Sequence, residues 1–367
     1  MVNSSSKKTV CLNMIVKNES SAIGECLDSV KKFIDYWIIV DTGSIDATEQ
    51  VVKRHLAGIP GEFHHQAWVN FSENRNGAYL LAKNRADYTL FIDADETLRV
   101  ADEFILPDLN KDIYSILVKQ KGASSAEKWF LVRNDMPWSW VGVIHETISC
   151  SSPVTKEMMP GLYIFSDTER GARSQDPGKY IKDAQILLKA LENDPTDARY
   201  RFFLAVCFLN ANQPDKALDH FQKRCLIGGD PRELYISHLY IGKLAEHFGK
   251  SEQFIIDSYA KAYYLNPHRS EALFYLAAFY QTIHQYPSSY DILVKAPRTH
   301  QGIPFYQEDA VYDWKLDYFL ARACLALRKY PEIRPALERV NRSSYLPEDV
   351  KEEVEKNLLI LQQEVCS

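Results

Sequence analysis

The sequence has no long apolar segment. No window approaches the ~18 uninterrupted apolar residues that a membrane-spanning helix needs. The N-terminal stretch MVNSSSKKTVCLNMIVKNE also lacks the apolar core of a secretory signal. We therefore expect no transmembrane segment and a cytoplasmic location, with peripheral membrane contact left open.

Paired cysteines are absent as well. The chain has 7 cysteines, an odd number, and none of them belongs to a CxxC pair. This spacing disfavours a zinc site built from cysteines. Several cysteines have apolar neighbours, which favours buried thiols in a reducing compartment. These are Cys26, Cys207 and Cys324.

An excess of basic residues is the third absence. Lys and Arg number 43 and Asp and Glu 49, so the formal net charge is −6. Nucleic-acid-binding surfaces are normally basic, so this balance disfavours a nucleic-acid partner. The 367 residues are 46% hydrophobic and 25% charged, as in an ordinary globular protein. This length predicts two or three domains, whose cores need no disulfide or metal.

Up to about residue 150, short apolar runs alternate with helical patterns. The first such pattern, in SSAIGECLDSVKKFI, places apolar residues from Ile23 to Ile34 on one helical face. Strand–helix alternation predicts a Rossmann-like α/β domain with a mostly parallel sheet and helices on both faces. Ligands of such sheets bind beyond the carboxyl ends of the strands, which here carry KNE, DTGS and DADE. The predicted strands are residues 9–16, 36–44, 61–68 and 88–92, and the predicted helices are 20–34, one that opens at Asp46, and 72–87.

The pattern continues less regularly to about residue 170. Residues 113–120 and 128–134 predict two more strands, separated by a turn in KGASSAE, and 162–166 predicts a last strand. The aromatic segment NDMPWSWVGVIHETISC is predicted to be irregular. We therefore expect one domain over residues 1–170.

The second half has a fixed period. Asp194-Pro195, Asp230-Pro231 and Asn266-Pro267 recur every 36 residues, and apolar positions follow each proline in register. One such set is Leu218, Phe254 and Tyr290. This pattern predicts an all-α, tetratricopeptide-like repeat domain over residues 176–367. We expect a further helix pair over 312–327, a capping helix over 346–365 and a long loop over 295–309.

The stretch TLFIDADETL ends a predicted strand with three acids. Asp93 and Asp95 both project beyond that strand, and Ala94 between them is small. Two carboxylates held together favour a divalent cation or a network of hydrogen-bond donors, because otherwise one of them tends to protonate. A solvated acidic turn is the alternative. We expect Glu96 to be a helix-start residue or a support for the site.

Five motifs in order resemble those of family-2 glycosyltransferases with the GT-A fold. They are NMIVKNES, VDTGSIDAT, FSENRNGAYLLA, TLFIDADETL and VRNDMPWSWVGVIHE. The last is similar to a block of a subgroup that couples the GT-A domain to tetratricopeptide-like repeats and includes the sublancin S-glycosyltransferase type. The family often has a second aspartate where this chain has Thr42, and an acidic pair where it has His145-Glu146.

The resemblance implies a nucleotide-diphosphate sugar, expected to be a UDP-sugar, as donor. Transfer would be metal-dependent and inverting, and the acceptor would be a protein, a glycan or a lipid-linked saccharide, held by the repeat domain. Asp93 and Asp95 would contact the ribose and hold Mn²⁺ or Mg²⁺, respectively. The other implied roles are Asp41 on the uracil or ribose, Glu19 near the nucleoside, Arg75 on the base or diphosphate, His145 as a second metal ligand, diphosphate contact or catalytic group, and Glu146 as catalytic base.

Alternatives remain for the residues and for the protein. Trp138 and Trp140 either stack on a sugar or acceptor or pack in the core. His64 and His65 have no partner spacing and are interpreted as structural. The letters DADET also fit a haloacid-dehalogenase-type phosphatase with Asp93 as nucleophile, and a non-catalytic repeat adaptor is the third hypothesis.

Overall fold

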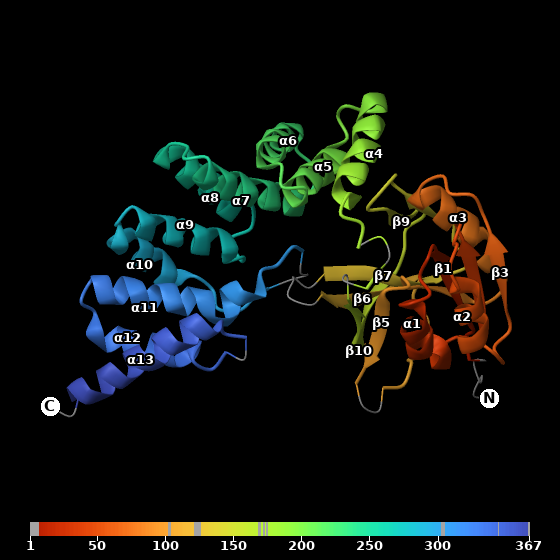
Figure 1. The fold of residues 1–367 in the computed structure, drawn as a ribbon, viewed down its shortest axis with the longest axis horizontal. Coiled ribbons are helices and arrows are strands. Elements are labelled where there is room, and N and C mark those ends of the chain that lie inside the picture. The colour runs from red at the N-terminus through yellow and green to blue at the C-terminus, as the bar shows by residue number, and fades with distance from the viewer. Residues whose placement is uncertain are drawn as a thin grey trace. The chain divides into compact units, whose positions relative to one another are not determined.

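The computed structural model describes residues 7–101, 104–120, 126–167, 170, 171, 173, 175–301, 305–343 and 345–365. The chain separates into two compact units, Met1–Asn193 and Asp194–Ser367. The first unit contains the sheet and the second is helical (Figure 1). Most of the predicted turn at KGASSAE lies outside the described residues.

The first unit is built on an eight-stranded sheet. Its strand order is β3-β2-β1-β4-β7-β6-β10-β5. Strands β3, β2, β1 and β4 are parallel, as is the β6–β10 pair, whereas β4–β7, β6–β7 and β10–β5 are antiparallel. The mostly parallel α/β prediction is therefore confirmed. The strands are β1 (Val10–Val16), β2 (Tyr36–Asp41), β3 (Gly61–His65), β4 (Tyr88–Phe91), β5 (Glu96–Val100), β6 (Ile113–Gln120), β7 (Ala126–Arg133) and β10 (Lys156–Ser166).

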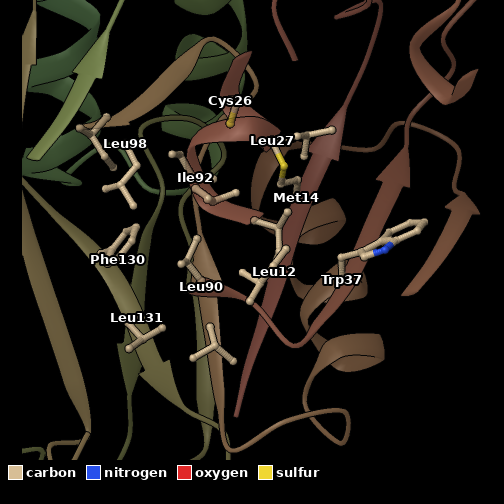
Figure 2. Close-up of a cluster of buried hydrophobic side chains, with 14 of the residues drawn as sticks. Leu12, Met14, Cys26, Leu27, Trp37, Leu90, Ile92, Leu98, Phe130 and Leu131 are labelled. Carbon is tan, nitrogen blue, oxygen red and sulfur yellow. The ribbon is translucent and has the colours of Figure 1, made fainter. Parts of the chain in front are cut away.

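Helices cover both faces of this sheet. Strand β1 directs Leu12 and Met14 toward α1 (Ile23–Val30) and α2 (Thr48–His55), whereas Cys11 packs with α3 (Phe71–Ala82) on the other face. Figure 2 shows the first of these cores, where Leu12, Met14 and Leu27 lie together. Each fully buried leucine contributes about 1.5–3 kcal/mol. Because both faces are covered, β1 is apolar on both sides apart from Asn13, whose side-chain amide donates to the Ala78 carbonyl at 2.9 Å.

The aromatic segment predicted to be irregular contains a β-hairpin. Strand β8 (Trp138–Val141) pairs antiparallel with β9 (Thr147–Cys150). Trp138 and Trp140 are buried in a core with Phe91, so alternation of these tryptophans marks the inner face of the hairpin. The irregular prediction was wrong because β8 has only 4 residues and its polar neighbours hide the period. Strand β5, which begins at Glu96, was also not predicted.

The second unit consists of antiparallel helix pairs. The predicted repeats are confirmed, and the final helix is present as predicted. Phe254, one of the expected core positions, is instead exposed, because it lies in the first turn of its helix. The predicted helix pair over 312–327 was wrong: a π-helical turn, Val311–Lys315, runs into one helix whose partner follows it. The helices are α5 (Ala198–Asn210), α6 (Pro214–Ile227), α7 (Pro231–His247), α8 (Glu252–Leu265), α9 (Glu271–Thr282), α10 (Tyr286–Lys295), α11 (Leu316–Ala326), α12 (Tyr330–Val340) and α13 (Glu348–Val365).

Helix α4 (Lys179–Asn193) belongs to the first unit by its contacts, although its residues follow the last strand. Among the helices that the structure describes, none is both long and apolar enough to cross a membrane. The described cysteines are all free, and Cys11, Cys26, Cys207 and Cys324 are buried.

Candidate functional site

The polar motifs meet at one edge of the sheet. In the order β3-β2-β1-β4, the chain leaves β1 toward β2 on one side, and β4 lies on the other. Such a reversal opens a crevice beyond the carboxyl ends of the two central strands, and ligands of open α/β sheets bind there. The loops after β1, β2 and β4 all reach this edge, which is therefore the candidate site.

The loops after β1 and β2 are tied together by short side chains. The Asn18 amide N–H donates to Ser44 Oγ at 2.8 Å, and the Ile45 amide N–H donates to Asn18 Oδ1 at 2.8 Å. Asn18 has a φ of 56°, a left-handed conformation that asparagine tolerates better than most residues. The Glu19 amide N–H donates to Thr48 Oγ1 at 2.9 Å. These bonds fix the path of both loops before any ligand binds.

Asp41 ends β2 and is buried. Its Oδ1 accepts from the Gly43 and Ser44 amides at 3.1 and 2.9 Å and from the Ser44 hydroxyl at 2.8 Å. An aspartate that accepts from the backbone two residues ahead stabilises a turn in this way. Its Oδ2 lies 3.5 Å from His65 Nδ1, so the histidine interpreted as structural sits beside a candidate nucleoside contact.

Asp93 is held by cations on both sides. Arg75 Nη2 donates to Asp93 Oδ1 at 2.7 Å, and Lys128 Nζ donates to Asp93 Oδ2 at 2.7 Å. Burial by itself raises the pKa of Asp93, but Arg75 and Lys128 outweigh burial and hold that pKa well below its usual range. Asp93 is therefore a carboxylate near neutral pH, and both of its oxygens are in ion pairs.

Glu96 holds the backbone of Asp93. It is buried, and its Oε2 accepts from the Asp93 amide at 2.8 Å while the Glu96 amide donates to the Asp93 carbonyl at 3.0 Å. Lys128 Nζ also donates to both Glu96 carboxylate oxygens, at 2.8 and 2.7 Å. Lys128 therefore divides its three N–H donors among three carboxylate oxygens. Glu96 begins a strand, so the expected helix-start role was wrong and the supporting role is confirmed.

Asp95 is the neighbouring carboxylate, and it is half-buried. Burial raises the pKa of Asp95, and the negative charge of Asp93 raises it further. Gly171 closes against Asp95, because a Cβ at this glycine would overlap the Asp95 carboxylate. Among the described residues no ion pair involves Asp95. Of Asp93 and Asp95, Asp95 is therefore the carboxylate that a bound cation would stabilise more.

Glu146 approaches from the β8–β9 hairpin. Its Oε1 accepts from Arg75 Nε at 2.6 Å, so one guanidinium bridges Glu146 and Asp93. Trp140 packs against the same guanidinium, with Arg75 Cζ 5.0 Å from its ring centre. Asn76 fixes the hairpin to α3, because its amide group pairs with the Trp140 N–H and carbonyl at 2.7 and 2.9 Å. The hairpin is therefore anchored to the helix that carries Arg75.

Glu19 and His145 lie on loops. The Glu19 carbonyl accepts from the Ala22 and Ile23 amides at 3.0 and 2.9 Å, so its backbone starts α1. His145 is exposed in the β8–β9 loop and has a φ of 52°, which places it in the left-handed region. The structure brings Arg75, Asp93 and Glu146 into direct contact.

The residues at the crevice can supply only some of the ligands that a divalent cation needs. Arg75 and Lys128 are the two cations at the crevice. The four carboxylates there are Asp93, Asp95, Glu96 and Glu146, so two negative charges remain without a cation. Within the described residues, however, no group of three or more His, Cys, Asp or Glu is arranged to hold a metal. Mg²⁺-type sites often use one or two carboxylates and complete the shell with substrate phosphates and water. Asp95 fits that kind of site, and a cage made wholly of protein ligands does not.

Comparison with known proteins defines the class of the first unit. Residues 11–108 match the model of glycosyl transferase family 2, so this part of the first unit is similar to that family. The particular relatives include the SPbeta prophage-derived glycosyltransferase SunS of Bacillus subtilis, which is 34% identical over 226 residues, 59% of this chain and 53% of that protein.

Shorter matches fall on other relatives. The lipopolysaccharide core biosynthesis glycosyltransferase LpsC of Rhizobium meliloti is 31% identical over 26% of this chain and 35% of its own length. A TPR repeat-containing protein of Synechococcus elongatus is 40% identical over 24% of this chain and 21% of its own length. This chain thus spans about half or less of the curated relatives it matches. A crystal structure of MamA aligns over 49% of this chain and 86% of MamA at 14% identity, with a TM-score of 0.36.

Sequence reasoning missed three residues of this site. Lys128 lies on β7, two positions from the buried Phe130, so it shares the inner face of that strand. The two-residue spacing between Lys128 and Phe130 was the feature of the sequence that could have placed Lys128 on this face. His65 lies at the end of β3, where parallel strands converge. Gly171 had no signal, because only the folded chain brings it to Asp95.

Proposed function

We propose that this protein is a metal-dependent glycosyltransferase that uses a nucleotide-diphosphate sugar, a UDP-sugar in particular. The observation that carries the proposal is the pair of aspartates at the crevice between β1 and β4. Asp93 is neutralised by Arg75 and Lys128, while Asp95 stands beside it without an ion pair among the described residues. A diphosphate brought there with a divalent cation would satisfy both Asp95 and the nearby cations.

The donor is proposed to lie across the three loops. Asp41 is the contact for the uracil or ribose, and its hydrogen-bonded turn keeps the carboxylate in place. Asp93 is the contact for the ribose, and Glu19 lies near the nucleoside. Asp95 would hold Mn²⁺ or Mg²⁺, with His145 proposed as a second ligand or diphosphate contact. The bound cation would supply charge for the diphosphate leaving group.

Transfer then needs a base and stabilisation of the leaving group. Glu146 is proposed as the base that takes the proton from the acceptor nucleophile, and Arg75 keeps its carboxylate oriented at 2.6 Å. The Arg75 guanidinium also faces the charge that develops as the sugar–phosphate bond breaks. Direct attack on the sugar carbon from the side opposite the diphosphate inverts that carbon.

The acceptor is proposed to be selected by the helical unit. We assign residues 1–170 to catalysis and residues 176–367 to acceptor recruitment. Stacked helix pairs build extended surfaces that hold peptides or other chains. A protein, a glycan or a lipid-linked saccharide would each suit such a surface.

The phosphatase alternative gains one observation and loses two. It requires a lysine near the nucleophilic aspartate, and Lys128 contacts Asp93. Arg75 and Lys128, however, engage both Asp93 oxygens, so attack on a phosphate would first have to break an ion pair. The family match over residues 11–108 also includes the strands and helices that precede Asp93. The non-catalytic adaptor does not explain why six charged groups are kept at the crevice.

The experiment that tests the proposal replaces Asp95. We expect Asp95→Asn to lower sugar transfer about 10³-fold, equivalent to about 4 kcal/mol, because the cation at the diphosphate loses its carboxylate. Transfer and donor hydrolysis would be measured over a panel of nucleotide-diphosphate sugars with Mn²⁺, with Mg²⁺ and with chelator. Asp291→Asn, at an exposed position on α10, is the matched control. Unchanged activity of the Asp95 variant would contradict the site.

A further inference from the structure

Lys128 lies outside the residues that the family resemblance assigns. It sits on β7, beyond the matched residues 11–108, and its side chain is only 25% exposed. Its ammonium group contacts three carboxylate oxygens, one of Asp93 and both of Glu96. A lysine placed in this way is committed to organising carboxylates.

The contacts divide the acids of the crevice into two kinds. Asp93 has one oxygen on Arg75 and the other on Lys128, each at 2.7 Å, and its amide is held by Glu96 at 2.8 Å. Glu96 has both oxygens on Lys128. Asp95, two residues from Asp93, takes part in none of these bonds. A cation that arrives therefore meets Asp93 and Glu96 already occupied and Asp95 available.

We propose that Lys128 is a positioning residue that withholds Asp93 and Glu96 from the divalent cation, so that the cation binds through Asp95 and stays weakly held until the donor diphosphate completes its shell. This inference rests on the proposed function. Weak binding in the absence of donor follows because one carboxylate is a poor site for a cation that takes six or more oxygens.

Removal of the Lys128 charge has an unusual expected sign. In Lys128→Met, one oxygen of Asp93 and both of Glu96 lose their cation, and the cluster gains one unit of negative charge. The more negative crevice then attracts a divalent cation more strongly, because the Lys128 charge no longer repels it. Metal affinity should rise in the variant while sugar transfer falls, because Asp93 is no longer fixed. Loss of a merely structural lysine would lower both.

The test measures Mn²⁺ binding to the full chain without donor, by the loss of the free-ion electron paramagnetic resonance signal. We expect Lys128→Met to bind Mn²⁺ at least about tenfold more tightly than wild type. Lys128→Gln, which keeps an N–H donor for the carboxylates, should change in the same direction and guards against misfolding of the first variant. Adding Asp93→Asn to Lys128→Met should remove most of the gain.

The outcomes separate this proposal from the proposed function. If folded Lys128→Met and Lys128→Gln both bind Mn²⁺ no more tightly than wild type, the positioning role is overturned. If wild type transfers sugar from none of the nucleotide sugars tested, the proposed function fails, yet the Mn²⁺ comparison still reads the role of Lys128. Thermal melting and circular dichroism of each variant establish that the compared proteins are folded.

Discussion

At the scale of single residues, the crevice is a problem of charge placement. Four carboxylates and two cations lie within one small region, and isolated buried charges are costly. The cost is met by pairing: Arg75 spans Asp93 and Glu146, and Lys128 spans Asp93 and Glu96. Burial of Arg75 and Lys128 opposes their charge, but the carboxylates outweigh it and keep the pKa of each above its usual value.

Gly171 offers a steric test of Asp95. We expect Gly171→Ala to lower transfer on the order of 100-fold, because the new methyl group would overlap the Asp95 carboxylate and displace it by about 1 Å. Gly178→Ala is the control, since its Cβ would lie 3.3 Å or more from its neighbours. Steady-state transfer rates and melting temperatures would be compared. A Gly171 variant as active as the Gly178 variant would show that Asp95 need not keep its position.

Three of the residues singled out from the sequence motifs are in contact in the structure. Arg75, Asp93 and Glu146 come from three separate motifs, and the structure joins them by direct hydrogen bonds. Lys128 was not predicted, because its register with Phe130 does not reveal its partners, which only the folded chain brings together. The roles proposed for Arg75, Asp93 and Glu146 remain predictions, as do those of Glu19, Asp41, Asp95 and His145.

At the scale of elements, the β8–β9 hairpin was missed, whereas helices α1, α2 and α3 were found. A helix of 12 residues, such as α3, repeats its apolar period several times, whereas a four-residue strand shows only two inward positions. In β8 these are Trp138 and Trp140, and both are buried. Short strands are specified by their partners, so their sequence alone carries too little signal.

Two partly buried histidines of the second unit predict that its stability depends on pH. His220 on α6 and His238 on α7 each have a pKa lowered to about 4, chiefly by burial. Nearby lysine and arginine charges add to the effect, and Asp219 opposes it in part at His220. An unfolded histidine has a pKa of about 6.5. Between these values the unfolded chain takes up protons that the folded chain does not, so the free energy of unfolding falls as pH drops from about 6.5 to 4.

The measurement is a series of thermal melts. We expect the melting temperature of the second unit to be about 5 °C lower at pH 5 than at pH 7, allowing for the partial exposure of both rings. His220→Gln with His238→Gln should flatten this dependence, and His268→Gln, at an exposed position, should leave it unchanged. Equal pH dependence in wild type and the double variant would contradict the assignment.

At the scale of the whole molecule, two kinds of periodicity predicted the architecture. Strand–helix alternation recurs along the first half, and the 36-residue spacing links three prolines in the second, so one local error does not change the outcome. The exact ends are less determined. Helix α4 follows the last strand yet belongs to the first unit, because contacts rather than sequence order decide where a unit ends.

The proposed division of labour between the units has a direct test. We expect a chain of residues 1–193 to retain donor binding and slow donor hydrolysis but to transfer sugar to its acceptor at least about 100-fold more slowly, because the acceptor is no longer held near the donor. Circular dichroism and binding of the nucleotide would establish that the shortened chain is folded. Transfer by the folded, shortened chain at the full rate would refute acceptor recruitment by the repeats.

The position of Lys128 has a practical consequence for how such chains are cut and compared. The match to the family-2 model ends at residue 108. The charged residues of the crevice extend from Arg75 to Glu146, and Gly171 packs against Asp95. A fragment that ends at residue 108 would keep Asp93 and Asp95 but would lose Lys128, one of the two cations that balance their charge. Minimal expression fragments and alignments of distant relatives should therefore extend past β10, or they will describe an acidic edge that does not exist in the intact fold.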